Sequence, residues 1–187
     1  MEIMDAIRGR RAVRDYTDKK VSKAAIIELI DAAVMAPTAL DEEPWAFVMV
    51  QGRQKLQDYS DRAKAHFLKT FSPGRDPHSV RRDLLADPKF NIFYNAGTLV
   101  VIYCRPSLQW APIDCALAAE NLMLAAYAMG LGTCPIGFAQ SWLDDAEVKR
   151  ELRVPGDLTA ILPIIVGYPT KAPPKISRHK PEITFCS

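Results

Sequence analysis

One segment, residues 114–129 with the sequence DCALAAENLMLAAYAM, is apolar on nearly every side of a helix and is followed by Gly130. Such a helix is stable when other elements cover it, and a glycine just past the last turn is a common way to end it. We therefore expect a central buried helix. At 187 residues, 49% of them hydrophobic and 25% charged, the chain is long enough to form a single domain, residues 1–187, around that helix.

Short β-prone runs provide the candidate strands. Two of them, 46–50 and 98–104, have the aliphatic and aromatic composition of buried strands. A third run, 158–166, contains Pro163, which cannot donate a backbone hydrogen bond and therefore favours an edge strand or a bulge. The sequence thus predicts three core strands, of which the third is irregular.

Apolar residues at helical spacing predict two further helices, one over 22–34 with Ser22 as its N-cap and one over 53–71. Asp144 and Glu147 match a capping box and predict a third, short helix after them.

Two other stretches give no clear element. Residues 76–95 are polar, and the tail 168–187 is rich in proline and has no core of its own. The tail therefore needs another surface on which to lie.

Four arginines lie within RGRRAVR, residues 8–14, although the formal net charge of the chain is only +2. Such a cluster alone is most often a solvated surface. A nucleic-acid-binding domain usually has a strongly basic balance, whereas here 24 basic residues face 22 acidic ones. The pattern favours a small anionic ligand and no nucleic acid partner.

Several classes of site and location are not expected. The cysteines at 104, 115, 134 and 186 form no CxxC pair and the histidines are scattered, so we expect no metal and interpret each cysteine as a core residue or a free thiol. No dinucleotide fingerprint, Walker A loop or GxSxG motif is present. No signal-like order or apolar run of roughly 18 to 20 residues appears, which predicts a cytoplasmic protein without membrane contact. An enzyme with this sequence would use a bound cofactor.

Four segments, taken in order, resemble motifs of the FMN-dependent nitroreductase family: RRAVRDY, APTALDEEPWAFVMV, AAENLMLAAYAMGLGTCPIGF and GYPTKAPPK. The resemblance covers essentially the whole chain. It implies an α+β fold with a central, mainly antiparallel sheet wrapped by helices. It also implies an intertwined homodimer with FMN at the subunit interface, in which the tail 168–187 reaches over the partner.

The resemblance also implies which residues bind the flavin. The basic pair is Arg10 and Arg11, with at least one of them near the pyrimidine edge, and guanidinium groups suit a phosphate because they bind it in a bidentate manner. The same motif contributes Ala12, in place of the usual Ser, and Arg14 at the phosphate end. A late basic residue for the phosphate would be Arg178 or, in another register, Lys180.

Two turns complete the implied site. One matches the segment that approaches the flavin from the partner chain, and the other matches the backbone stretch that faces the ring near N5; the residues are Pro37, Thr38, Ala39 and Asp41 in the first and Pro135, Ile136 and Gly137 in the second. Asp41 and Glu43 replace an Asn and a Gln of the family pattern. Their charge would lower the flavin potential unless they face solvent or pair with an arginine such as Arg14.

The resemblance implies ping-pong chemistry. NADH or NADPH gives a hydride to flavin N5, and an electron-poor acceptor such as a nitroaromatic or a quinone then takes the electrons, so no side chain need act as acid or base. Trp45, Phe90 and Tyr94 are candidates for the acceptor pocket, although aromatic residues more often belong to the core. The alternatives are a specialised flavin enzyme of dehalogenase or flavin-fragmenting type, a non-catalytic flavin-binding module, and a nucleic-acid binder.

Overall fold

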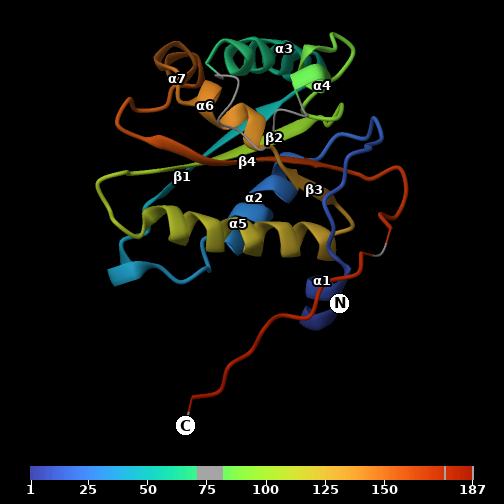
Figure 1. Ribbon diagram of the computed structural model, residues 1–187, viewed down its shortest axis with the longest axis vertical. Helices are drawn as coiled ribbons and strands as arrows, with labels where there is room; N and C mark the ends of the chain where they lie inside the picture. Colours follow the sequence, from blue (N-terminus) through green and yellow to red (C-terminus); the bar gives the residue numbers. More distant parts are fainter. Residues whose placement is uncertain (71–81, 175, 187) are drawn as a thin grey trace.

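A four-stranded antiparallel sheet forms the centre of the computed structural model, which describes residues 1–70, 82–174 and 176–186 (Figure 1). The strand order is β1-β2-β4-β3. The bounds are β1 (Trp45–Gln51), β2 (Thr98–Cys104), β3 (Gly132–Pro135) and β4 (Thr159–Gly167). The three predicted strands are confirmed, and β3 lies where the sequence suggested only a turn.

Helices cover both faces of this sheet. On the upper face in Figure 1 lie α3 (Arg53–Thr70), α4 (Arg82–Ala86), α6 (Gln140–Leu143) and α7 (Ala146–Leu152), and on the lower face lie α1 (Ile3–Gly9), α2 (Lys23–Ala33) and α5 (Ala111–Ala128). Short 3-10 turns, η1 (Ala39–Asp41) and η3 (Gly137–Ala139), join some of these elements. The predicted α+β fold, an antiparallel sheet wrapped by helices, is confirmed.

Strand β2 separates two hydrophobic clusters. All of its residues are buried, because helices pack on both faces of this central strand. Leu99 and Val101 join the cluster beneath α3, α6 and α7, whereas Val100 and Ile102 join the cluster that includes α2 and α5. This alternation explains why residues 99–104, LVVIYC, are hydrophobic at every position. Strand β1, at the edge, is only half-buried.

Pro163 lies in β4, which is not an edge strand, so the edge-strand alternative is wrong. Strand β4 does contain the bulge of the other alternative, at Ile161, while Pro163 itself pairs regularly with Val101. The register between β2 and β4 shifts between Ile102 and Tyr103. On the other side of β4, Ile136 N–H donates to the Pro163 carbonyl over 2.8 Å. Because proline has no N–H to return this bond, regular pairing with β3 ends at Pro135.

Most predicted helix ends agree with the structure. Ser22 Oγ accepts from Ala25 N–H at 3.1 Å, which confirms this N-cap. The predicted helix over 53–71 is confirmed through Thr70, while residues 71–81, including the first part of the polar stretch, lie outside the described residues. Helix α5 starts three residues before the predicted position because Pro112 is accommodated in its first turn, and Gly130 follows it with φ +74°.

The predicted capping box is wrong about the cap. Asp145 is the N-cap of α7, and its side chain accepts from Glu147 N–H at 2.8 Å. Asp144 instead accepts from Ala160 N–H at 2.7 Å and pairs with Lys149. A bond to a strand far along the chain therefore decides which of two adjacent aspartates caps the helix.

Helix α5 is only partly buried within one chain. Its residues toward the sheet are covered, but Ile113 is 53% exposed and Leu117 is 42% exposed. Ile3 and Ile7 of α1, on the same side of the sheet, are also exposed (Figure 1). The expectation of a helix buried on every side is not met by a single chain. No helix within the described ranges combines the length and apolarity that crossing a membrane requires.

The N-terminal segment after α1 packs along β3 and the end of β4. Ala12 bridges Thr133, and Val13 N–H donates to the Thr133 carbonyl at 2.9 Å. A Cβ atom on Gly132 would lie 2.7 Å from Val13 Cγ2, and one on Gly167 would lie 2.7 Å from Tyr16 Cδ1. These two glycines are register partners, so together they form the flat surface on which this segment lies.

We expect Gly132→Ala and Gly167→Ala each to lower the free energy of unfolding by about 1–3 kcal/mol, because the added methyl group would displace a packed side chain. Denaturant unfolding measures this change. Gly156→Ala is the matched control, since a Cβ there meets no atom within 4 Å. Equal stability of all three variants would contradict the close packing described above.

Candidate functional site

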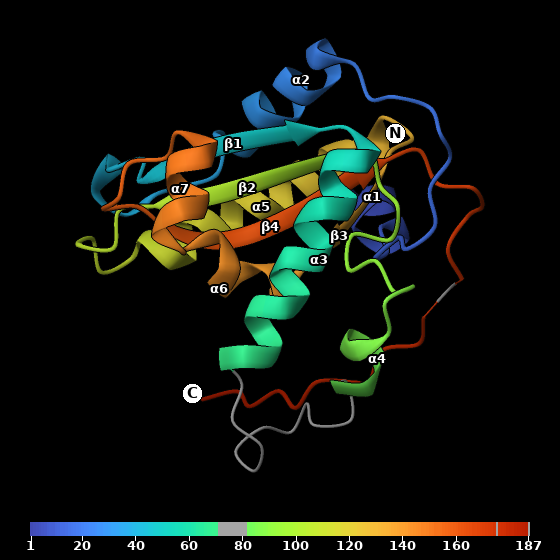
Figure 2. The ribbon, with the colours of Figure 1, turned by 90° about the horizontal axis from the view of Figure 1, so that it is seen from above.

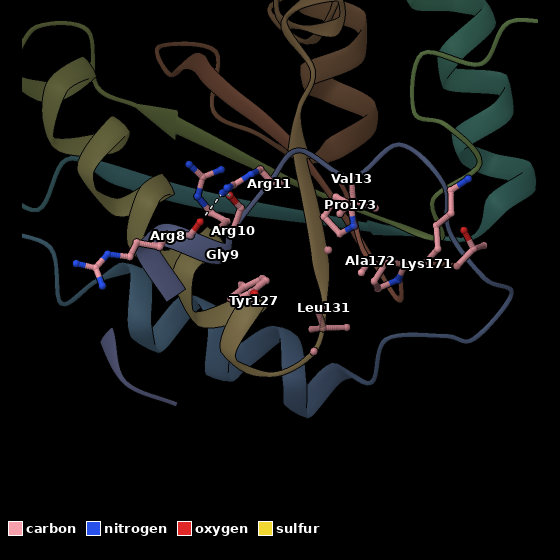
Figure 3. Close-up of a pocket in the computed structure, with 14 residues that line it drawn as sticks. Arg8, Gly9, Arg10, Arg11, Val13, Tyr127, Leu131, Lys171, Ala172 and Pro173 are labelled. Carbon is pink, nitrogen blue, oxygen red and sulfur yellow. Dashed lines mark hydrogen bonds between the residues drawn. The ribbon is translucent and has the colours of Figure 1, made fainter. Parts of the chain in front are cut away.

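A cavity of about 780 Å³ lies between the end of α1, the last turn of α5, the start of β3 and the segment that follows β4 (Figure 3). Arg8, Arg10 and Arg11 lie at one end of it, and Lys171 lies at the other. The lining consists of residues 8–11, 13, 127, 130–132 and 169–173. Cationic side chains therefore dominate the charged part of the cavity wall.

The end of α1 sets the position of the arginines. Arg10 N–H donates to the Ala6 carbonyl at 2.9 Å and closes the helix. Gly9 packs directly on the phenol of Tyr127 in α5, since a Cβ there would lie 2.2 Å from Tyr127 Oη. A side chain at residue 9 would push the helix end away from α5. The glycine thus allows the arginines to leave α1 beside the cavity.

The two arginines of the pair have different surroundings. Arg10 Nε lies 3.1 Å from Glu120 Oε1, and the two side chains are 22% and 44% exposed. Arg11 Nη1 donates to the carbonyls of Arg8 and Arg10 at 2.7 and 2.6 Å. Arg11 Nε is buried and has no hydrogen-bond partner among the described residues. A buried donor without a partner is rare, so the Arg11 guanidinium keeps a hydrogen-bonding capacity that no described residue uses.

Arg14 lies elsewhere and does not line this cavity. Its guanidinium is 5.8 Å from the centre of the Tyr94 ring. Burial raises the pKa of the Cys134 thiol, and the Arg14 guanidinium beside that thiol opposes the rise. Because Cys134 directly precedes Pro135, the structure brings Arg14 close to the predicted stretch 135–137.

Within 135–137, only Gly137 offers a free backbone donor. Pro135 has none, and Ile136 N–H is used by the Pro163 carbonyl. No described residue accepts from Gly137 N–H, which stands at the start of η3 and is exposed. A planar ligand beside this turn would therefore receive its hydrogen bond from Gly137.

The other predicted turn is not at the cavity in the same chain. Ala39 N–H donates to Asp114 Oδ2 at 3.2 Å, which places residues 37–41 beside the first turn of α5. Tyr127, which lines the cavity, is in the last turn, and Figure 1 shows η1 and α1 near opposite ends of α5. The structure therefore keeps Pro37, Thr38, Ala39 and Asp41 apart from Arg10 and Arg11.

The 38–43 turn has an unusual backbone. Leu40, Asp41 and Glu43 have φ values of 54°, 55° and 43°, a region that side-chain-bearing residues seldom adopt. Asp41 and Glu43 are exposed, and neither forms an ion pair with Arg14 or any other described residue. Their influence on a flavin potential stays a prediction.

Lys171 and Arg8 were missed as site residues by the sequence analysis. Arg178 and Lys180 lie exposed in the tail, outside the cavity wall, and Lys171 lines it instead. Thr17 N–H donates to the Tyr168 carbonyl at 2.9 Å, so the segment after β4 returns to the N-terminal segment. Only this long-range pairing, which the sequence does not reveal, brings Lys171 to the cavity.

The three aromatic residues predicted for the acceptor pocket do not lie together. Phe90 and Tyr94 form an edge-to-face pair with ring centres 5.7 Å apart, next to Arg14. Trp45 packs against the hydrophobic cluster that contains α2 and α5. In addition, the described residues contain no group of three or more His, Cys, Asp or Glu placed to hold a metal ion.

A sequence model of the nitroreductase family matches residues 7–168. The chain belongs to the nitroreductase family. Among its relatives, the 4-nitrobenzoate reductase of a Nocardioides species is 28% identical, with 90% of this chain and 81% of the relative covered. The nitrobenzene nitroreductase of Ectopseudomonas oleovorans is 24% identical, with 92% and 89% covered. This nitroreductase-family membership indicates an oxidoreductase.

The crystal structure of a nitroreductase with bound FMN from Bacteroides fragilis superposes on this family member with a TM-score of 0.86. The two chains are 27% identical, and each is covered completely. The nitroreductase-like fold implied by the four sequence segments is therefore confirmed over the whole chain.

We expect Arg11→Ala in this nitroreductase-family protein to weaken FMN binding by about 1.5–3 kcal/mol, the range for hydrogen bonds to a charged group. Arg10→Ala should have an effect in the same range, reduced by the share of its charge that Glu120 already neutralises. Flavin titration gives both affinities. Arg150→Ala, at an exposed arginine of α7, is the control. Unchanged affinity in both cavity variants would make the arginine pair a solvated surface.

Proposed function

We propose that the protein is an FMN-dependent NAD(P)H oxidoreductase that reduces electron-poor acceptors such as nitroaromatics or quinones. The observation that carries the proposal is the buried, unpartnered Arg11 Nε beside a cationic cavity, in a chain of the nitroreductase family. A flavin phosphate would supply the missing acceptor once the Arg11 side chain turns its Nε toward the cavity. The FMN in the structure from Bacteroides fragilis and the activities in the names of the relatives support this assignment.

The residues at the cavity fit a phosphorylated cofactor. The volume of the cavity, about 780 Å³, is within the usual range of ligand pockets. An FMN phosphate carries nearly two negative charges, and Arg10 and Arg11 would hold it at their end of the cavity. Lys171, at the other end, would add positive charge to the cavity without contacting the same group. The carboxylate of Glu120 neutralises part of the charge on Arg10. Arg8, Arg11 and Lys171, which pair with no carboxylate among the described residues, therefore keep their full charge for the ligand.

The rest of the motif serves a second position. Arg14 is outside the cavity wall and lies beside the Tyr94 ring and the Cys134 thiol, so we assign it, with the Gly137 N–H, to a second position and not to the phosphate end that the resemblance implies. When bound, FMN would supply the two-electron chemistry at N5, with NADH or NADPH as reductant and the acceptor as oxidant in a ping-pong cycle. The chain's own residues bind, orient and shield the cofactor. None of them is required as an acid or base.

A homodimer completes the proposal. The turn 37–41 would reach the partner's flavin, because within one chain it lies beside the opposite end of α5. The exposed Ile113 and Leu117 of α5 would be covered by the partner. In the tail, which leaves the body of the chain in Figures 1 and 2, Ile183 is 69% and Phe185 is 92% exposed. Apolar side chains displayed in this way are typical of association surfaces.

The visible spectrum of the purified protein tests the function. We expect flavin bands, their loss on anaerobic addition of NADH or NADPH, and their return when a nitroaromatic or a quinone is added. Flavin bands that neither nicotinamide changes would favour the non-catalytic flavin-binding alternative. A dehalogenase or flavin-fragmenting enzyme would be indicated if reduction occurs but neither acceptor restores the bands. A protein that binds no FMN would contradict the proposal.

Truncation after Pro174 tests the role of the tail. It keeps the pairing of Tyr16 with Pro169 and keeps Lys171, but removes the exposed apolar tail. We expect the truncated protein to lose dimerisation, measured by light scattering, and to bind FMN more weakly. The double variant Arg178→Ala/Lys180→Ala separates the two roles predicted for the tail, since it removes these charges and keeps Ile183 and Phe185, and it should remain dimeric. A truncated protein that stays dimeric and yellow would show that the tail is dispensable.

A further inference from the structure

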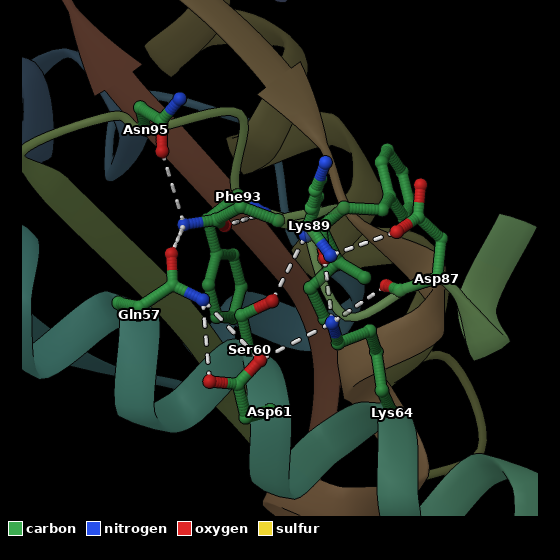
Figure 4. A network of polar contacts seen from close by, with 11 residues as sticks. Gln57, Ser60, Asp61, Lys64, Asp87, Lys89, Phe93 and Asn95 are labelled. Atoms are coloured by element: carbon green, nitrogen blue, oxygen red, sulfur yellow. Dashed lines mark hydrogen bonds and ion pairs between the residues drawn. The ribbon is translucent and has the colours of Figure 1, made fainter.

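A network of polar side chains on α3 fastens the segment 87–95, here called the brace, to the body of the protein (Figure 4). Lys64 is central to it, with a side chain only 7% exposed. Its Nζ donates to the carbonyls of Asp87 and Phe90 at 3.3 and 2.6 Å and lies 3.2 Å from Asp61 Oδ1. The buried ammonium group of Lys64 therefore holds two backbone carbonyls of the brace.

The second half of the brace is held in the same way. Asn91 Nδ2 donates to Gln57 Oε1 at 2.7 Å, and Ile92 N–H donates to Ser60 Oγ at 3.0 Å. Asn91 Oδ1 in turn accepts from Phe93 N–H at 2.7 Å. Together with Asp61 and Lys64, these α3 residues at 57, 60, 61 and 64 have the spacing of one helix face. One face of α3 therefore fixes the whole brace.

The brace ends in a backbone conformation that needs such support. Tyr94 and Asn95 have φ values of 50° and 58°, and residues with side chains adopt this region only where the surroundings enforce it. The conformation directs the Tyr94 ring toward Arg14, whose guanidinium lies 5.8 Å from the ring centre. Phe90 packs against the same ring at 5.7 Å. The polar network thus ends in one cation–aromatic contact.

Arg14 has few other contacts that could hold it. It is exposed and forms no ion pair with a carboxylate among the described residues. Its neighbours are the Tyr94 ring and the Cys134 thiol. A long side chain with no carboxylate partner samples many rotamers, and the Tyr94 ring, together with the Cys134 thiol, reduces that freedom for Arg14.

We propose that the brace is a positioning device for the flavin site: Lys64 and its network hold Tyr94 in place, and Tyr94 holds the Arg14 guanidinium ready for the bound cofactor. The inference rests on the proposed function, in which Arg14 is a flavin ligand. Tyr94 and Lys64 are positioning residues, since they act through Arg14. They would affect how tightly the flavin is bound without contacting its reactive atoms.

A double-mutant cycle on FMN affinity tests this proposal. We expect Tyr94→Leu to raise the FMN Kd about three- to tenfold, the range of a cation–aromatic contact, and Tyr94→Phe to stay within about twofold of the wild type. In the Arg14→Ala background, Tyr94→Leu should have no further effect, because the residue through which it acts is gone. Lys64→Met should resemble Tyr94→Leu, whereas Lys55→Met, an exposed lysine of the same helix, should leave the Kd unchanged.

The outcomes separate this inference from the proposed function. A wild type that binds no FMN would overturn both. A wild type that binds FMN, with Tyr94→Leu unchanged in Kd, with Tyr94→Phe as weak as Tyr94→Leu, or with effects that multiply in the double variant, would overturn the positioning role alone. If Lys64→Met does not fold, as judged by its unfolding transition, the Tyr94 and Arg14 variants still decide the question.

Discussion

The contact on which the candidate site depends is the close approach of residues 12–16 to two paired glycines of the sheet. Gly132 and Gly167 leave room for Val13 and Tyr16, and the backbone of the segment bonds to β3 and to the residues after β4. The segment also covers the otherwise open edge of β3, so it protects a strand that could pair with another chain. The position of Arg14 follows from this packing, whereas the arginines at the end of α1 are positioned by the contact between Gly9 and Tyr127.

The packing divides the motif arginines between two environments. Arg10 and Arg11 line the cavity next to α5, whereas Arg14 is outside the cavity wall and faces Tyr94 of the brace. One run of charges in the sequence thus serves two positions in space. The surrounding groups differ as well, since a carboxylate compensates Arg10 while an aromatic ring faces Arg14. A cofactor with an anionic group at one end and a polar ring at the other would use both.

Local patterns predicted the elements whose signals are local. Ser22 marks its helix, and the run 98–104 forms a central strand, because a cap or a continuous apolar run needs no distant partner to be recognised. The sequence of β3 shows no alternation, and this strand exists through its pairing with β4 and with Val13. The choice of Asp145 over Asp144 as a cap, and the place of Lys171 at the cavity, also depend on contacts between residues far apart. The family motifs singled out Arg10 and Arg11, which line the cavity, but did not predict that Arg10 forms an ion pair with Glu120.

The same long-range pairing affects how the protein is made. Thr170 and Asp15, which bond to each other through backbone and side chain, are 155 residues apart in the sequence. Contacts of such high sequence separation form late and slow the folding of a domain. During synthesis, residues 12–16 have no surface to pack against until β3, β4 and the residues after them have left the ribosome. The cavity therefore forms only after residues up to Pro173 have left the ribosome, and a cofactor cannot find its site on a shorter nascent chain.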